Sequence, residues 1–152
     1  MRSIHIAVAV ALATALAVVS AATAATTSSA RATSVGTART GLGRVVVDTR
    51  GRTLYLFEKD RRGHSACSGL CVTYWPPLLA HGKPVAMAGI KQSRLGTIRR
   101  SDGRRQVTLA GHPLYRYAGD TKPGQTTGEG LQDFGAEWDA LTPAGKKIEA
   151  AG

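Results

Sequence analysis

The chain has few aromatic and few sulfur-containing residues: its 152 residues include two tryptophans, two phenylalanines, four tyrosines, two methionines and two cysteines. Most of the aromatics sit in two similar stretches of the sequence. Acidic residues are scarce as well, since 10 of them stand against 20 lysines and arginines, which gives a formal net charge of +10. This excess favours anionic partners such as wall polymers, acidic lipid headgroups or nucleic acid, although solubility alone would also account for it.

Sequence signatures of hydrolytic enzymes are absent. The chain contains no G-x-S-x-G, no H-E-x-x-H and no phosphate-binding glycine loop. Acidic side chains gather only near Trp138, where they could mimic the carboxylate pair of a glycosidase, but a solvated loop is the simpler interpretation. We therefore expect a protein that is not an enzyme and that needs no cofactor.

Long apolar runs are confined to the N-terminal end. Arg2 is followed by an apolar stretch over residues 4–19 and by an A-x-A cleavage site at 22–24, which predicts a signal peptide over residues 1–24. An uncleaved membrane anchor over residues 6–25 is the alternative. No cysteine lies next to the predicted cleavage site, so lipid attachment at a mature N-terminal cysteine is not expected. The prediction is a secreted, extracytoplasmic protein.

The remaining sequence divides into a leader and a domain. Residues 25–41 are mostly Ala, Thr, Ser, Gly and Arg without an apolar period, which predicts a flexible leader. Order should begin near Leu42, so residues 42–152 form a single β-rich domain.

An internal duplication organises this domain. Residues 51–60 and 111–120 both read G-x-x-L-Y-x-aromatic-x-x-D. A second shared pattern, W-x-x-L-x-x-x-G-K-x-(V/I), follows at residues 75–85 and 138–148. The chain therefore contains two tandem repeats, repeat one over about 42–88 and repeat two over about 104–150, and neither can bury its apolar face alone.

Each repeat is expected to contain a hairpin. In repeat one, residues 45–47 and 53–57 read as strands around the turn 48–51, and side chains alternate between the two faces of a strand. Tyr55 and Phe57 share one face, as do Tyr115 and Tyr117, so this aromatic face should pack on a common core. Arg116 suggests that the opposite face is at least partly wet.

The predicted fold is mainly β: one small domain of two tandem hairpin-containing repeats, each with a short helix or turn, related by a pseudo-twofold axis. Asp60 and Asp120 close the motif strands, where each could accept hydrogen bonds from the next backbone amides in an Asx-turn. Trp75 and Trp138 occupy equivalent positions and are interpreted as packing residues and not as platforms for sugars.

The two cysteines, Cys67 and Cys71, lie in the exported part, where a disulfide is permitted. Ser65 could cap a short helix that places them one turn apart on one face, within bridging distance. The alternative is a copper or zinc site, or a redox site, that uses His64 with the two thiolates.

A run of arginines separates the repeats. Nucleic-acid binding would need aromatics among them, and none is present, so a wall-facing or membrane-facing surface is the better use of their charge. The residues of this predicted anionic-surface site are Arg94, Arg99, Arg100, Arg104 and Arg105.

The motif Y-x-(F/W/Y)-x-x-D at residues 55–60 and 115–120, together with S-x-C-x-G-x-C-x-x-x-W-P-P at 65–77, resembles the bacterial secreted repeat and lipoprotein family of unknown function. The resemblance spans about residues 42–148 and implies an exported protein of the cell envelope. It supplies no catalytic residues. The function expected from the sequence is a non-enzymatic binding or structural module of the envelope with a basic surface.

Overall fold

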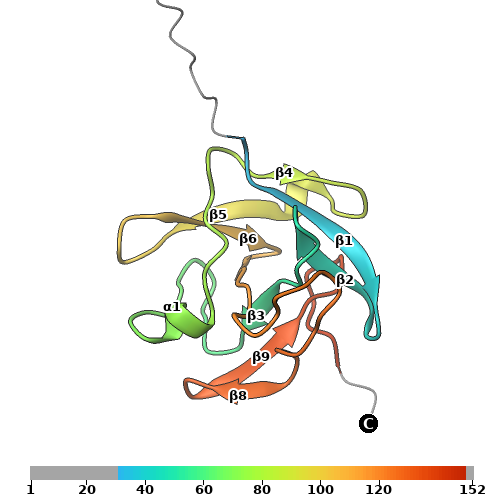
Figure 1. Cartoon of the computed structure of the whole chain (residues 1–152). Coiled ribbons are helices and arrows are strands. Elements are labelled where there is room, and N and C mark those ends of the chain that lie inside the picture. Colours follow the sequence, from blue (N-terminus) through green and yellow to red (C-terminus); the bar gives the residue numbers. More distant parts are fainter. Residues whose placement is uncertain (1–30, 150–152) are drawn as a thin grey trace, which may run out of the picture.

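The computed structural model describes residues 31–149, and strands make up most of its regular structure (Figure 1). The elements are β1 (Ser34–Thr40), β2 (Gly43–Asp48), β3 (Tyr55–Phe57), α1 (Cys71–Tyr74), β4 (Val85–Ala86), the 3-10 turn η1 (Gln92–Arg94), β5 (Leu95–Arg99), β6 (Arg105–Leu109), β7 (His112–Pro113), β8 (Leu131–Asp133) and β9 (Ala136–Ala140). Their strand orders are β2-β1-β4, β3-β9-β8 and β5-β6-β7. The predicted mainly β fold is confirmed, whereas the predicted signal peptide lies outside the described residues.

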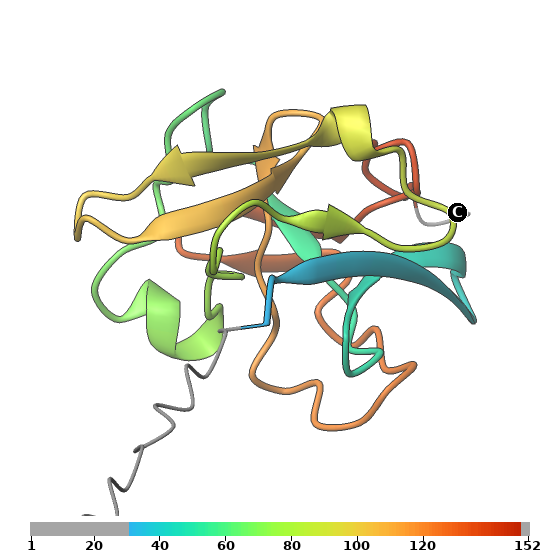
Figure 2. The same ribbon diagram turned by 90° about the horizontal axis from the view of Figure 1, so that it is seen from above.

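Each repeat opens with an antiparallel hairpin. β1 pairs with β2, and β5 pairs with β6, and in Figure 2 the two hairpins extend toward opposite sides of the domain. After β2 the chain reverses direction, and the segment before β3 lies against β2: the amide of Leu54 donates to the carbonyl of Val46 at 2.9 Å. The equivalent bond in repeat two joins Leu114 to Val107 at 3.0 Å.

The predicted leader was wrong at its C-terminal end, because β1 occupies residues that composition assigned to it. The fold begins at Ser34, where Val35 is fully buried and β1 pairs with the whole length of β2. Backbone pairing to a β-branched partner strand outweighs the weak strand preference of a Thr-, Gly- and Arg-containing segment. The sequence of β1 alone does not show that partner.

The two repeats interlock instead of lying side by side as separate units. The amide of Val46 in β2 donates to the carbonyl of Leu141 in repeat two at 3.0 Å, and Val107 in β6 donates to Leu78 in repeat one at 2.9 Å. Across the centre, Tyr55 and Tyr115 exchange two backbone hydrogen bonds, of 2.8 and 3.0 Å. These reciprocal bonds define a pseudo-twofold axis that passes between the two tyrosines.

The core has two parts, one on each face of the motif strands. The aromatic part contains Tyr55, Phe57 and Tyr115, as predicted, and the aliphatic part contains Leu54 and Leu56. The expectation that this second face is wet was wrong for repeat one, because both leucines are at most 4% exposed. They belong to one aliphatic cluster with Val46 of β2 and with Val107 and Leu109 of β6, and a pattern within one strand cannot reveal such partners from both repeats.

The helix α1 is a single turn over Cys71–Tyr74 and has no side-chain cap. The predicted cap by Ser65 was wrong, since this serine lies six residues upstream and contacts other side chains. Cys67 therefore precedes the helix and does not share a helical face with Cys71. No helix among residues 31–149 has the length and apolar character needed to cross a membrane.

Candidate functional site

Four aromatic rings stack through the centre of the molecule. Trp75 and Trp138 lie face to face with centroids 4.0 Å apart, Phe57 stacks on the outer side of Trp138 at 4.0 Å, and Tyr117 lies against Trp75 at 4.5 Å. Each outer ring belongs to the repeat opposite to the tryptophan it contacts. Because both tryptophans are fully buried, they are packing residues and offer no surface to a sugar.

The tyrosine and aspartate of the shared motif bond across the axis. The Tyr55 hydroxyl donates to Asp120 Oδ2 at 2.5 Å, and the Tyr115 hydroxyl donates to Asp60 Oδ2 at 2.7 Å. Each motif therefore supplies the phenol for one pair and the carboxylate for the other. The fixed spacing of tyrosine and aspartate is explained by this exchange, which needs both groups at set positions along each repeat.

The second carboxylate oxygen of each pair holds the loop that follows it. Asp60 Oδ1 accepts from the amide of Ala66 at 2.7 Å, and Asp120 Oδ1 accepts from the amide of Thr127 at 3.0 Å. The predicted Asx-turns were wrong, because these amides lie six and seven residues downstream. Each aspartate holds both ends of a loop together. The rules for local turns do not predict hydrogen bonds between residues so far apart in the sequence.

Titration at this centre follows from its burial. Burial, with the hydrogen bond and charge of Asp120, raises the pKa of Tyr55 above its ordinary value. Burial and the charge of Asp60 do the same for the pKa of Tyr115, so both phenols keep their protons and act as donors. Burial raises the pKa of Asp60 to about 6, against the opposing effect of its hydrogen bonds. The arrangement is a structural lock in which each buried polar group has a partner.

Arg100 was wrongly predicted to be a surface residue. It is 6% exposed, and its guanidinium donates to Ser65 Oγ at 2.9 Å, to Gln106 Oε1 at 2.5 Å and to the carbonyl of Cys67 at 2.6 Å. It ties the β5–β6 hairpin to the loop that carries the first cysteine. No pattern in the sequence distinguishes this arginine from its exposed neighbours.

The other four predicted arginines, Arg94, Arg99, Arg104 and Arg105, are exposed on the β5–β6 hairpin and the turn before it. Arg104 forms an ion pair with Asp102 at 2.7 Å, and this contact lowers the pKa of Asp102 to about 2. Arg99 and Arg105 stand directly opposite one another in the register of β5 and β6. Beside them lies a cavity of about 460 Å³ lined by residues that include Lys83, Thr97 and Arg105.

Cys67 and Cys71 are joined by a disulfide, with their Cα atoms 5.4 Å apart. Both sulfurs are used by this bond, so neither is available as a thiolate to copper or zinc. Within residues 31–149, no group of three or more His, Cys, Asp or Glu side chains is placed to hold a metal ion. The alternative site at His64, Cys67 and Cys71 is thus not assembled in this structure.

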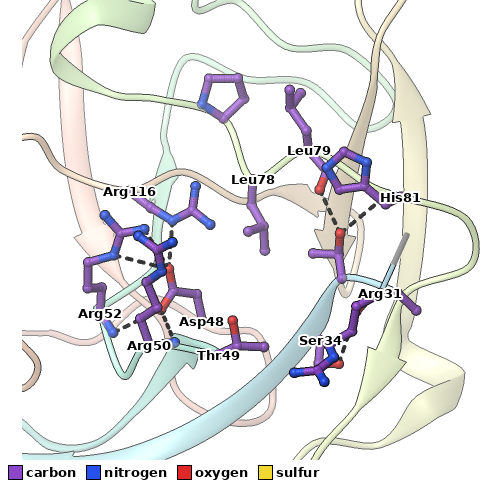
Figure 3. Close-up of a pocket in the computed structure, with 13 residues that line it drawn as sticks. Arg31, Ser34, Asp48, Thr49, Arg50, Arg52, Leu78, Leu79, His81 and Arg116 are labelled. Atoms are coloured by element: carbon purple, nitrogen blue, oxygen red, sulfur yellow. Dashed lines mark hydrogen bonds and ion pairs between the residues drawn. The ribbon is translucent and has the colours of Figure 1, made fainter. Parts of the chain in front are cut away.

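A larger cavity, of about 590 Å³, lies where repeat one meets repeat two (Figure 3). Arg50, Arg52 and Arg116 surround the buried carboxylate of Asp48 on one side of it, and Arg31 and His81 lie on the other side. Sequence reasoning missed this site because its arginines are scattered along the chain. The only available signal was Arg116, a charged residue at the position of Leu56 in the other repeat.

These features define a class of molecule: a small mainly β module in which two repeats interlock through exchanged tyrosine–aspartate pairs. Residues 36–79 and 96–142, more than half of the chain, match the family described as a secreted repeat of unknown function. The chain belongs to this family, which confirms the resemblance read from the motifs and supports an extracytoplasmic location. No curated protein and no solved structure matches the chain.

Proposed function

We propose that this protein is a non-enzymatic module that binds an anionic polymer of the bacterial cell envelope through the β5–β6 hairpin. The proposal is carried by the pairing of Arg99 with Arg105. Like charges directly opposite one another destabilise an antiparallel pair, so their placement costs the hairpin stability. A polymer with a negative charge between them would remove that repulsion.

The surroundings of this pair also favour a polyanion. Arg94 and Arg104 add positive charge at the start and at the turn of the same hairpin, with Asp102 as the ion-pair partner of Arg104, and both Lys83 and Arg105 line the cavity of about 460 Å³. The hairpin does not need these charges to fold, because β5 and β6 pair through their backbones and bury Ile98 and Val107. Arg99 forms no side-chain hydrogen bond or ion pair within residues 31–149, and an exposed cation without such a structural contact is typical of a surface used for binding.

The test compares two variants that each lose four positive charges. In the hairpin variant, glutamine replaces Arg94, Arg99, Arg104 and Arg105. In the control variant, glutamine replaces four exposed cations elsewhere that form no such cross-strand pair: Arg61, Arg62, Lys122 and Lys146. Both are incubated with purified bacterial cell wall, and the bound fraction is measured over a salt series.

The hairpin variant should lose most of its retention at physiological salt, and the control variant should lose little. Equal losses would show that total charge, and not the hairpin, determines retention. Unchanged retention of the hairpin variant would overturn the proposal. The hairpin variant also loses the bonds of Arg94 to the Ala144 carbonyl and of Arg105 to the Thr97 hydroxyl, and the Arg104–Asp102 ion pair. Thermal unfolding of both variants is therefore measured beside retention to show that both are folded.

A further inference from the structure

The cavity of about 590 Å³ has the construction of a discrete binding site. It is lined by residues of both repeats, among them Asp48 and Arg52 from repeat one and Arg116 from repeat two. Its volume lies in the range of pockets that take small molecules. Leu79, which is partly exposed, supplies an apolar part of the lining.

Asp48 fixes the arginines and is itself fully used. Its side chain is 2% exposed, and Oδ1 accepts from the amides of Arg50 at 2.8 Å and Arg52 at 3.1 Å. Oδ2 accepts from the Arg52 guanidinium at 3.1 and 3.2 Å and from Arg116 Nε at 2.7 Å. With this number of donors the carboxylate has no role left except to position the two guanidinium groups.

The charge of this anchor is secure at neutral pH. Burial acts to raise the pKa of Asp48, but the hydrogen bonds from Arg116 and from the amides of Arg52 and Arg50 outweigh burial, so the pKa lies below its ordinary value. The carboxylate therefore stays ionised and holds Arg52 and Arg116 in place before any ligand arrives. Such preorganisation lowers the entropic cost of binding.

Donors remain for a ligand. Arg116 uses only Nε toward Asp48, and among residues 31–149 its terminal nitrogens make no hydrogen bond. The exposed guanidinium of Arg50 likewise has no hydrogen-bonding partner within the described part of the chain. Figure 3 shows the guanidinium groups of Arg50, Arg52 and Arg116 gathered at Asp48 on one side of the cavity.

The charge balance of this side selects the ligand. Three guanidinium groups against one carboxylate leave an excess of two positive charges. A carboxylate ligand would supply one negative charge, whereas a phosphate monoester carries close to two at neutral pH. Planar guanidinium groups also match the oxygens of phosphate in paired hydrogen bonds.

We propose that this cavity binds a phosphate monoester, with the phosphate against Arg50, Arg52 and Arg116 and the esterified group toward Leu79. Arg31 and His81 on the opposite side meet the far end of the ligand. The same chemistry is present in soluble phosphate monoesters and in a monoester lipid headgroup such as that of phosphatidic acid, whereas the phosphodiester of a wall polymer carries only one negative charge per phosphate. This inference does not rest on the hairpin proposal, because the cavity and the hairpin share no residue.

The test is calorimetric titration of the whole protein with glycerol 3-phosphate, inorganic phosphate and acetate at low salt. Glycerol 3-phosphate should bind with saturation and more tightly than acetate or inorganic phosphate. Vesicles that contain phosphatidic acid, and a glycerol phosphodiester, distinguish a lipid or polymer source from a free monoester. Tightest binding of glycerol 3-phosphate or of the phosphatidic acid vesicles supports the inference and names the source, whereas tightest binding of the phosphodiester, which carries one negative charge, contradicts the monoester.

Two variants test the residues. Arg50→Gln removes an exposed guanidinium with no ion pair of its own among residues 31–149, so the variant should fold normally and bind the ester about tenfold more weakly. Arg39→Gln is the matched control, because Arg39 is exposed, has no ion pair within residues 31–149 and does not line the cavity, and it should bind as the original protein does. The inference is overturned if no ester binds with saturation, if acetate or inorganic phosphate binds as tightly, or if the two variants lose equally.

The hairpin variant separates this inference from the proposed function. It retains every residue of the cavity, so it should bind glycerol 3-phosphate normally even where it no longer adheres to cell wall. Failure of the hairpin proposal would leave this titration unchanged. Loss of ester binding in the hairpin variant would contradict the cavity as the binding site.

Discussion

Cys67 of repeat one and Gly128 of repeat two occupy equivalent positions next to the aromatic centre, but the loops that carry them are held there by different contacts. A Cβ atom at Gly128 would lie 2.9 Å from the rings of both Tyr55 and Trp75, so the loop of repeat two packs directly on the aromatics. The loop of repeat one is held by the disulfide and by Arg100, which binds the Cys67 carbonyl. The same lock is thus supported by close packing on one side and by polar contacts on the other.

The β1–β2 and β5–β6 hairpins also differ in whether an equivalent buried position is apolar or polar. The reciprocal backbone bonds make Val45 of β2 equivalent to Gln106 of β6, and both are fully buried. Val45 packs in the aromatic core, whereas Gln106 accepts from Arg100 and donates to the carbonyl of Leu114 at 2.8 Å. A buried polar side chain is tolerated here because its hydrogen bonds are satisfied.

The two junctions between the repeats also differ, and here the difference concerns binding. Asp48 and Arg116 at one junction correspond to Leu109 and Leu56 at the other, where both leucines join the aliphatic core. The two repeats share the tyrosine–aspartate contacts that cross the axis, but they differ in the residues around these contacts. The proposed ester site lies where one junction became charged.

The largest effect should come from the ring stack that both repeats share. Replacing Trp138 or Trp75 by alanine removes a fully buried ring and should lower the free energy of unfolding by about 3–5 kcal/mol in each case. Urea denaturation of both variants measures this loss. A much smaller loss for one tryptophan would show that the two rings contribute unequally to stability although they occupy equivalent positions in the stack.

Gly128→Ala should disturb the loop of repeat two where it packs most closely on the aromatic rings. The added methyl group must displace the rings of Tyr55 and Trp75, which should cost about 1–3 kcal/mol of stability by overpacking. Gly41→Ala is the control, because nothing lies within 4 Å of its added Cβ atom. If both substitutions change the unfolding midpoint equally, the close packing of the second loop is not a constraint.

The two tyrosine–aspartate pairs should differ in the stability they provide. Tyr55→Phe leaves Asp120, which is 3% exposed, without its phenol donor and should cost about 1–2 kcal/mol. Tyr115→Phe should cost less, because the positive charge of Arg100 still favours the ionised form of Asp60. Chemical denaturation at pH 7 gives both values. A larger loss for Tyr115→Phe would contradict the assigned role of Arg100.

The smallest effect should come from Asp139, which follows Trp138 where repeat one has Pro76 after Trp75. Asp139 is 1% exposed, and its Oδ2 has no hydrogen-bonding partner among residues 31–149. Burial and the charge of Glu137 raise its pKa to about 7. A raised carboxyl pKa means that the folded protein binds the proton more tightly than the unfolded chain. Its stabilising contribution is therefore complete below pH 3.8 and is lost as the pH rises through about 7.

Asp139→Asn removes this titration and should stabilise the protein by about 1 kcal/mol at pH 8. Thermal unfolding across pH 4–8 is the measurement. The original protein should lose stability over this range, with a residual slope from Asp60, whose pKa is about 6, and the variant should lose less. Parallel pH profiles for the two proteins would contradict the assignment to Asp139.

The sequence by itself determined the duplication, the mainly β character and the burial of the aromatic face. These features follow from patterns within one segment: the alternation that places Tyr55 and Phe57 on one face, and the repetition that makes Trp75 equivalent to Trp138. The same local reasoning failed for β1, whose strand depends on pairing with β2.

Only the tertiary structure decided which residues meet across the axis. The phenol of Tyr55 bonds Asp120 and not Asp60, although both aspartates occupy the same place in the motif. Arg100 is buried and Arg99 is exposed, although they are neighbours in the sequence. The ester site joins Asp48 to Arg116, 68 positions along the chain. Each outcome depends on how two distant segments pack together, which composition and periodicity within a segment do not determine.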